Sequence, residues 1–207
     1  MENFSALIEQ AIEAMTWVEI GAVVASLTYV ILAARENIWC WFFGIIGAAL
    51  WAYAAYEFFD LYIDALLQSY YVFISIYGWY KWNGNKLNKK DLGISTLKIK
   101  EHAVLIAGGF ALTLVVGYFF GRYTAAASTY LDAFTTVFSI LATYLVTRKI
   151  LENWLYWIII DTVYIYLYFS REGYLFALLN VVFVVVSVVG YLNWQKKKKK
   201  LEKLEIA

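Results

Sequence analysis

Seven apolar stretches of nearly membrane-spanning length dominate this sequence. A transmembrane helix needs about 20 mostly apolar residues, and 63% of the chain is hydrophobic whereas 16% is charged. An ordinary soluble domain is about 45–50% apolar and about 25% charged, so the composition excludes a free-standing soluble globule. Polar residues recur at helical spacing, which favours helices over barrel strands. The sequence therefore predicts an all-α membrane protein with seven transmembrane helices, at residues 17–34, 39–56, 63–82, 103–120, 130–146, 154–169 and 174–194.

The basic residues predict the orientation of these spans. Cytoplasmic loops of membrane proteins carry an excess of lysine and arginine. With seven spans, one side receives only Arg122 and Arg171, and the other receives the remaining fifteen. We therefore expect the N-terminus outside and the C-terminus in the cytoplasm. The cytoplasmic set is Arg35, Lys81, Lys86, Lys89, Lys90, Lys98, Lys100, Arg148, Lys149, Lys196, Lys197, Lys198, Lys199, Lys200 and Lys203.

The segment before the first span has its own pattern. Residues 1–16 place apolar side chains on one helical face, which is typical of an amphipathic helix on the membrane surface. A frayed tail is the alternative. The apolar positions are Phe4, Leu7, Ile8, Ala11, Ile12 and Met15.

The chain also contains an internal repeat. Glu36-Asn37-x-x-x-Trp41 recurs as Glu152-Asn153-x-x-x-Trp157, an offset of 116 residues, and Ala65-Leu66-Leu67-Gln68 recurs as Ala177-Leu178-Leu179-Asn180, an offset of 112. Two parallel three-helix repeats joined by a linker helix, a 3+1+3 arrangement, would produce this pattern, and transporters are commonly built from such repeats. The domains expected are the segment 1–16, a first repeat 17–82, a basic cytoplasmic loop with the linker helix 83–129, a second repeat 130–194 and a basic cytoplasmic tail 195–207.

Polar and aromatic stripes on the predicted helices indicate a binding site near the middle of the membrane. Polar side chains that face lipid are costly, so these stripes should face inward. Asp161 is the clearest candidate, because carboxylates within a membrane are usually functional, and its counterpart at the offset of 116 is Ile45. The candidate substrate-binding residues are Trp41, Gln68, Tyr71, Ser75, Trp157, Asp161, Tyr164, Tyr168, Asn180 and Phe183.

Other polar and aromatic residues have a structural interpretation. Serines and threonines of span 130–146 are expected to bond backbone carbonyls, and Gly44 with Ala48 to form a close-packing seam. Tryptophans at span ends are typical of the interfacial belt. Asp132 is expected to cap a helix, and His102 is expected to lie at a solvated edge. The tryptophans are Trp39, Trp82, Trp154 and Trp194.

The predicted lining favours a flat cationic ligand. Tryptophan and tyrosine faces stack on rings and attract cations, whereas amides and hydroxyls can read a sugar or a carboxamide. No span carries a lysine in its middle for a retinal Schiff base, and no nucleophile–base pair or metal cluster indicates an enzyme. We expect no cofactor, no metal and no nucleic-acid partner.

The same motifs resemble a known family. The segment Glu36–Trp82, with Glu-Asn-Ile-Trp-Cys-Trp, Asp-Ala-Leu-Leu-Gln and Tyr-Gly-Trp-Tyr-Lys-Trp, is similar to the bacterial nicotinamide riboside transporters of the PnuC family. The second copy, from Glu152 through Asp161 to Tyr191, fits as well. The resemblance implies a SWEET-like fold, a homotrimer in the bacterial inner membrane, and binding by the region of Trp157 and the stripes of Gln68 and Asn180.

The resemblance also implies a mechanism. Members of the family carry nicotinamide riboside by facilitated diffusion with alternating access, and a cytoplasmic riboside kinase traps the product. Thiamine or riboflavin carriage, and proton- or sodium-coupled symport with Asp161 as the coupling group, remain alternatives, as does a receptor that binds without transport. Because the chain has no proline, we expect alternating access to use hinges at Gly44, Gly47, Gly78 or Gly190, to use loop hinges, or to move whole helix bundles.

Overall fold

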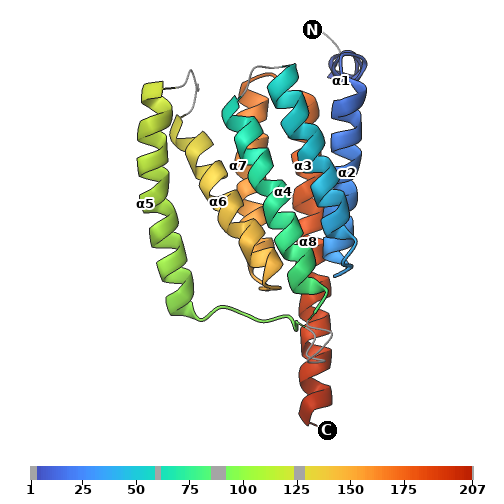
Figure 1. Cartoon of the computed structure of the whole chain (residues 1–207), viewed down its shortest axis with the longest axis vertical. Helices are drawn as coiled ribbons and strands as arrows, with labels where there is room; N and C mark the ends of the chain where they lie inside the picture. Colours follow the sequence, from blue (N-terminus) through green and yellow to red (C-terminus); the bar gives the residue numbers. More distant parts are fainter. Residues whose placement is uncertain (1–3, 59–61, 85–91, 124–128, 207) are drawn as a thin grey trace. The chain divides into compact units, whose positions relative to one another are not determined.

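The fold is helical. A computed structural model describes residues 4–58, 62–84, 92–123 and 129–206, and Figure 1 shows the helices along the chain. Within these residues the only strand-like pairing is an isolated bridge between Ser95 and Ile150. The helices are α1 (Phe4–Glu13), α2 (Trp17–Ala34), α3 (Cys40–Glu57), α4 (Tyr62–Trp82), α5 (Ile99–Tyr123), α6 (Thr129–Thr147), α7 (Asn153–Ser170) and α8 (Tyr174–Ile206).

Helices occupy all seven predicted stretches, with ends that mostly agree within one or two residues. The two larger differences are in α5, which begins four residues earlier, and α8, which continues through the tail that we had expected to follow the last span. By length and composition, four of the helices in the described parts are long and apolar enough to cross a membrane: α2, α5, α6 and α8. The other three long helices carry more tryptophan and tyrosine, which lowers their hydropathy. Lys86, Lys89 and Lys90 of the basic loop lie outside the described residues.

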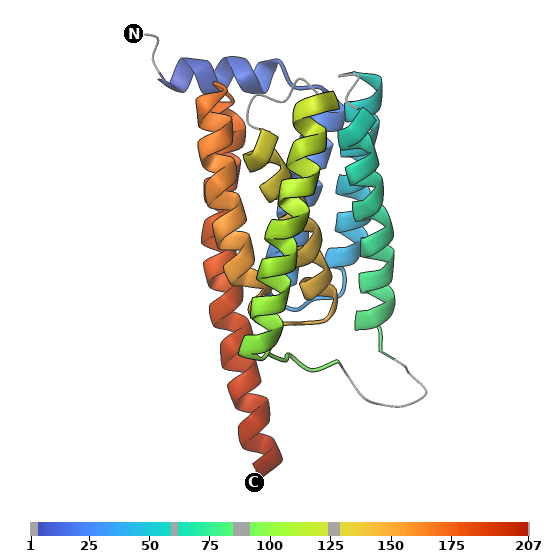
Figure 2. The same cartoon turned by 90° about the vertical axis from the view of Figure 1, so that its left-hand side faces the viewer.

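The chain divides into two units, which we describe separately. The first unit comprises residues 1–93 and 192–207. In it α3 packs against both α2 and α4, and α1 lies across the end of α2, as Figure 2 shows. Thr16 ends the turn between α1 and α2 with a capping box, because its hydroxyl accepts from the Glu19 amide at 3.2 Å while the Glu19 carboxylate accepts from the Thr16 amide at 2.8 Å. This arrangement suits a surface helix followed by a span.

Glycines let α3 and α4 approach closely in the first unit. A methyl group added at Gly78 would lie 2.5 Å from the ring of Trp41, and one added at Gly44 would lie 2.9 Å from the Ser75 hydroxyl oxygen. Both glycines are therefore needed for packing, since real side chains almost never approach so closely. The expected close-packing seam at Gly44 is confirmed.

The second unit, residues 94–191, has α6 packed against α5 and α7. On α5, Gly109 lies against the ring of Phe138 and Gly117 against that of Tyr130, where added methyl groups would approach to 2.7 and 2.5 Å. These contacts fix the linker helix α5 to α6. The buried core between α6 and α7 consists of Val137, Phe138, Ala142, Leu145, Tyr156 and Ile160.

The turn between α2 and α3 and the turn between α6 and α7 have the same backbone geometry. Glu36 and Lys149 both adopt a left-handed conformation, with φ of 55° and 51°. Around Glu36 the bonds run from Glu36 N to Ala33 O and from Asn37 N to Leu32 O, and around Lys149 they run from Lys149 N to Val146 O and from Ile150 N to Leu145 O. This is the hydrogen-bond pattern of a Schellman helix end, and it relates the two turns by 113 residues.

The register of the repeat at α3 and α7 is therefore 113 residues, and the predicted 116 is wrong. Trp154, three residues before Trp157, takes the place of Trp41, because a methyl group at Gly190 would lie 2.7 Å from the Trp154 ring just as one at Gly78 would meet Trp41. The offset of 116 came from matching identical residues in Glu-Asn-x-x-x-Trp. The structure instead aligns the two helices by the turn that precedes each of them and by the tryptophan–glycine contact. The counterpart of Asp161 becomes Ala48 in place of Ile45.

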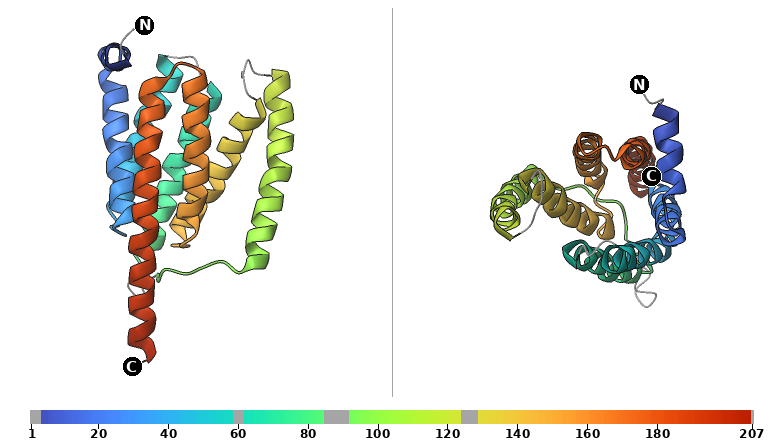
Figure 3. Two further views of the ribbon diagram at one scale, coloured as in Figure 1. Left: turned by 180° about the vertical axis from the view of Figure 1, so that it is seen from behind. Right: turned by 90° about the horizontal axis from the view of Figure 1, so that it is seen from above.

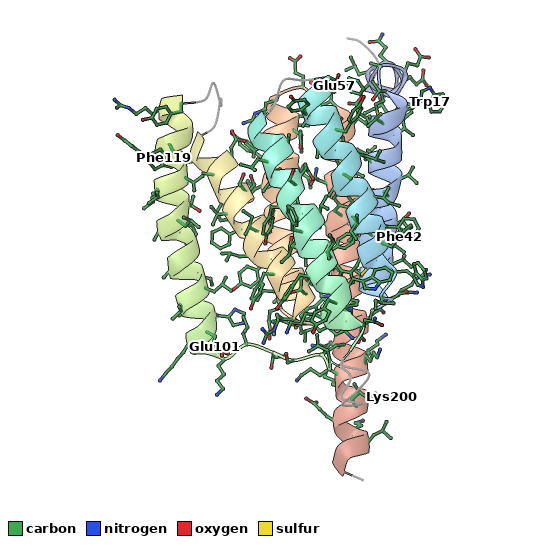
Figure 4. All side chains as sticks on the ribbon, in the orientation of Figure 1. Trp17, Phe42, Glu57, Glu101, Phe119 and Lys200 are labelled. Carbon is green, nitrogen blue, oxygen red and sulfur yellow. The ribbon has the colours of Figure 1, made fainter. Side chains whose placement is uncertain are left out.

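Three of the four tryptophans at predicted span ends are core residues. Trp39 is 55% exposed, as an interfacial residue would be, but Trp82, Trp154 and Trp194 are at most 8% exposed. Their indoles fill space beside glycines and other rings, which a sequence pattern does not reveal. The interfacial prediction is wrong for these three. Outward-facing aromatic residues lie elsewhere, and Figure 4 shows Trp17, Phe42 and Phe119 pointing away from the neighbouring helices.

Candidate substrate-binding residues

Asp161 lies inside the second unit, near the middle of α7. Its side chain is buried, with 3% of its surface exposed. No described residue forms an ion pair or a hydrogen bond with its carboxylate. A buried charge without a partner is costly, so this carboxylate is suited to a cationic ligand or a proton.

Aromatic rings follow Asp161 along α7 and reach α8. The rings of Tyr164 and Tyr168 stack with centroids 5.9 Å apart, and Tyr168 packs on Phe176 of α8 at 5.5 Å. Trp157, one turn before Asp161, packs with Tyr164 against the core of α6 and α7. The structure thus places the predicted stripe of Trp157, Asp161, Tyr164 and Tyr168 on one helix, as expected from their spacing.

The two predicted amides differ in their surroundings. Asn180 is buried on α8, and its amide nitrogen donates to the carbonyl of Phe176 at 2.8 Å. This bond uses the amide nitrogen of Asn180 as the donor, so the amide oxygen points away from the Phe176 carbonyl and can act as an acceptor. Gln68 on α4 is half-buried, as is Phe183 on α8.

The candidates of the first unit lie on the seam between α3 and α4. Ser75 is buried beside Gly44, whereas Tyr71 is half-buried and contacts the ring of Tyr70. Trp41 has no exposed surface, and its ring packs on Tyr29 and Trp82 at 5.8 and 5.3 Å. In this arrangement the indole of Trp41 is closed off from a ligand, and a substrate contact for it stays a prediction.

Two further polar residues lie near these candidates: Tyr29, which sequence reasoning missed and which is half-buried, and Ser187, which the repeat pairs with Ser75. Tyr29 of α2 contacts Trp41 and lies 3.1 Å from a methyl group placed at Gly44. Ser187 of α8 is 1% exposed and corresponds to Ser75 at the offset of 112. The signal available for Tyr29 was a tyrosine isolated in an apolar span, and the signal for Ser187 was the repeat itself.

Most structural interpretations of the remaining polar residues hold. Thr135, Thr143 and Thr147 donate to backbone carbonyls of their own helix at 2.7–3.1 Å, as expected. Asp132, expected to cap its helix, instead accepts from Arg171, whose Nη2 donates to both carboxylate oxygens of Asp132 at 2.7 and 2.9 Å. His102 Nδ1 lies 2.8 Å from the Tyr156 hydroxyl, so this histidine is tied to α7 and is not simply solvated.

The described residues contain no group of three side chains able to hold a metal ion. The second unit combines apolar helices with a buried carboxylate, stacked aromatic rings and the Asn180 amide, and polar groups of this kind within a membrane mark a substrate pathway. With the relatives that follow, these features define the class: the chain is an integral membrane transporter and not an enzyme.

The particular family follows from sequence. The profile of the nicotinamide mononucleotide transporter family matches residues 16–196, and the chain belongs to this family. The nicotinamide riboside transporter PnuC of Escherichia coli is 27% identical, with 87% of this chain and 85% of that protein covered. The riboflavin/roseoflavin transporter RibM of Streptomyces davaonensis is 25% identical, with 86% and 84% covered.

A solved structure supports the same relationship. The crystal structure of the vitamin B3 transporter PnuC matches this chain with a TM-score of 0.72 and 26% identity, and the match covers 89% of this chain and 83% of that one. The PnuC-family resemblance predicted from the motifs is confirmed.

Proposed function

We propose that the protein takes up nicotinamide riboside across the bacterial inner membrane. The observation that carries this proposal is the buried carboxylate of Asp161, which has no partner among the described residues and is followed by the stacked rings of Tyr164 and Tyr168. Nicotinamide riboside is a pyridinium cation with a ribose and a carboxamide. A carboxylate stabilises the positive charge, and aromatic faces attract a cationic ring.

The remaining candidates would supply orientation. The amide oxygen of Asn180 can accept from a hydroxyl or carboxamide of the ligand, and Gln68, Tyr71 and Ser75 add further hydrogen-bonding groups. Trp157 and Phe183 contribute apolar faces. Relatives named as nicotinamide riboside transporters support this substrate.

The mode of transport is part of the proposal. Two parallel three-helix repeats, α2–α4 and α6–α8, joined by α5, would permit facilitated diffusion with alternating access. Phosphorylation by a cytoplasmic riboside kinase would drive net uptake, and the carrier would be a homotrimer. The distribution of basic residues supports an outside N-terminus and a cytoplasmic C-terminus.

Counterflow in proteoliposomes tests the proposal. Liposomes loaded with unlabelled nicotinamide riboside should accumulate the labelled compound without ATP or an ion gradient, since exchange by a facilitative carrier needs neither. Liposomes without protein are the control. A protein that binds the vitamin but shows no counterflow would be a receptor, which would contradict the proposal.

Riboflavin is the second candidate, because the relative RibM is named as its transporter. Riboflavin is flat but uncharged, so a site built around Asp161 should prefer nicotinamide riboside. Thiamine, an aromatic cation, is a closer competitor in charge. Unlabelled riboflavin and thiamine in the same counterflow assay, each tested for its ability to compete, separate the three vitamins.

Proton- or sodium-coupled symport is the alternative for Asp161. In vesicles that lack a kinase, symport would accumulate the vitamin above its external concentration, and an uncoupler would abolish accumulation driven by protons. With the membrane potential clamped at zero, facilitated diffusion should only equilibrate the cationic vitamin, and its initial rate should not respond to the uncoupler.

A further inference from the structure

The turn between α2 and α3 is held by the cytoplasmic continuation of α8. The Lys197 ammonium lies 2.6 Å from the Glu36 carboxylate, and the Trp194 indole nitrogen donates to the carbonyl of Ala33 at 3.0 Å. The ring of Trp194 also packs on Trp82, at the end of α4, with centroids 5.9 Å apart. Figure 3 shows α8 running on as one helix to the C-terminus. We call the contacts of Trp194 and Lys197 with this turn the α8 clasp.

The ion pair of the clasp is not an ordinary surface pair. The Glu36 side chain is 7% exposed, whereas that of Lys197 is 53% exposed. Exposed pairs contribute little, whereas an ion pair made to a buried carboxylate weighs more, because that carboxylate has lost most of its water. Glu36 therefore depends on Lys197 more than the reverse.

The backbone at Glu36 makes the choice of residue informative. A Schellman helix end usually has glycine at its left-handed position, and a non-glycine residue there costs about 1–2 kcal/mol. Glu36 occupies this position with φ of 55°. A residue kept in a strained conformation points to a role for its side chain, and here that side chain binds Lys197.

The equivalent turn in the second unit is also held by a segment from outside its helices. The Ser95 amide donates to the carbonyl of Lys149 at 3.0 Å, and the Leu151 amide donates to the carbonyl of Ser95 at 2.8 Å. The Leu97 amide donates to the Glu152 carboxylate at 3.2 Å. Each of the two related turns is thus secured by the chain that follows a three-helix repeat, residues 95–97 in one case and 194–197 in the other.

We propose that Glu36 and Lys197 are positioning residues for transport. They fix the cytoplasmic continuation of α8 to the α2–α3 turn, so that this segment moves as one body with α2 and α3. Neither residue contacts the substrate, so their loss should slow exchange and leave substrate affinity unchanged. This inference rests on the proposed transport function.

Charge reversal tests the pair in the full-length protein. Lys197→Glu and Glu36→Lys should each slow counterflow at least about fivefold, a change of about 1 kcal/mol in the activation free energy. Their combination restores the opposite charges and should return the rate to within about twofold of wild type. Lysine is acceptable at this backbone position, since Lys149 adopts it. Lys199→Glu, an exposed lysine of the same run, is the matched control and should transport normally.

Glu36→Gly separates positioning from stability. Glycine relieves the backbone strain, so the apparent melting temperature should hold or rise, while counterflow should still fall because the carboxylate is gone. Calorimetric titration with the transported vitamin should give a Kd within about twofold of wild type for every variant, a change below 0.5 kcal/mol.

The outcomes distinguish the two proposals. A wild-type protein that exchanges none of the three vitamins would overturn the proposed function. Three results, each with normal wild-type exchange, would overturn the role of the clasp alone. They are normal rates in the single charge-reversal variants, a normal rate in Glu36→Gly, and no recovery in the double variant.

Discussion

At the scale of single residues, the two repeats are chemically unequal. In the register of 113 residues the counterpart of Asp161 is Ala48, which is also buried, and that of Trp157 is Gly44. The negative charge and its neighbouring indole therefore belong to the second repeat alone. A substrate whose charge lies at one end would be bound in one orientation by such an arrangement, since only one repeat can offer it a carboxylate.

Replacing the carboxylate tests this asymmetry. Asp161→Asn keeps the shape of the side chain but removes its charge, and we expect the affinity for nicotinamide riboside to fall about 10- to 100-fold, as for losing a charged hydrogen bond. Isothermal titration of the purified protein measures the affinity. Thr162→Val is the control, because Thr162 is exposed and its hydroxyl bonds only the Ile158 carbonyl in the described structure. Unchanged affinity in Asp161→Asn would exclude both a cation contact and a coupling role.

At the scale of helices, the four glycines that the sequence offers as hinges lie in packed contacts, and a hinge at any of them stays a prediction. Gly78 and Gly190 receive the rings of Trp41 and Trp154, and Gly44 and Gly47 lie against Ser75 and Ser26. Glycines in such contacts permit close approach of helices. These four glycines are therefore accounted for by packing, and bending at any of them would open a buried contact.

Gly78→Ala should be destabilising. Its methyl group would lie 2.5 Å from the buried Trp41 ring, and overpacking of this kind costs about 1–3 kcal/mol. A thermal denaturation scan in detergent should show a lower apparent melting temperature. Gly108→Ala is the matched helical control, since nothing lies within 4 Å of its added methyl group, and it should be neutral or stabilising because alanine favours helix by about 1 kcal/mol. Equal melting temperatures for the two variants would contradict the packing argument.

At the scale of the whole molecule, charge determines how the chain inserts. The near-zero net charge of +1 conceals a division of basic residues, fifteen on the predicted cytoplasmic side and two on the other. One of those two, Arg171, is neutralised by Asp132. The imbalance favours retention of the basic side in the cytoplasm.

Accessibility of single cysteines measures this orientation. The one native cysteine, Cys40, is buried, so Cys40→Ala gives a background for Glu172→Cys and Lys199→Cys. A membrane-impermeant maleimide should label position 172 in intact cells and position 199 only after permeabilisation. The reverse pattern would show that the orientation is inverted.

The extent of sequence-based prediction differs between fold and site. The helices lie where the apolar runs are long, because a chain in a membrane must bond its own backbone polar groups and a helix satisfies them within one segment. The stripe of Trp157, Asp161, Tyr164 and Tyr168 lies on one helix because helical spacing requires it. The predicted repeat offset of 116 residues was wrong because identical residues were matched three positions away from the equivalent turn. The prediction that Trp82, Trp154 and Trp194 are interfacial failed because an interfacial tryptophan and a core tryptophan have the same sequence pattern.

The sequence by itself determined the helical membrane class, the seven helical stretches, the predicted orientation and the family, because these follow from hydropathy, charge and motif, which are properties of the linear chain. Only the tertiary structure decided which tryptophan meets which glycine, which residue of the first repeat corresponds to Asp161, and that Lys197 pairs with Glu36. These depend on contacts between residues as many as 161 positions apart, such as Glu36 and Lys197, whose distance in space no local pattern encodes.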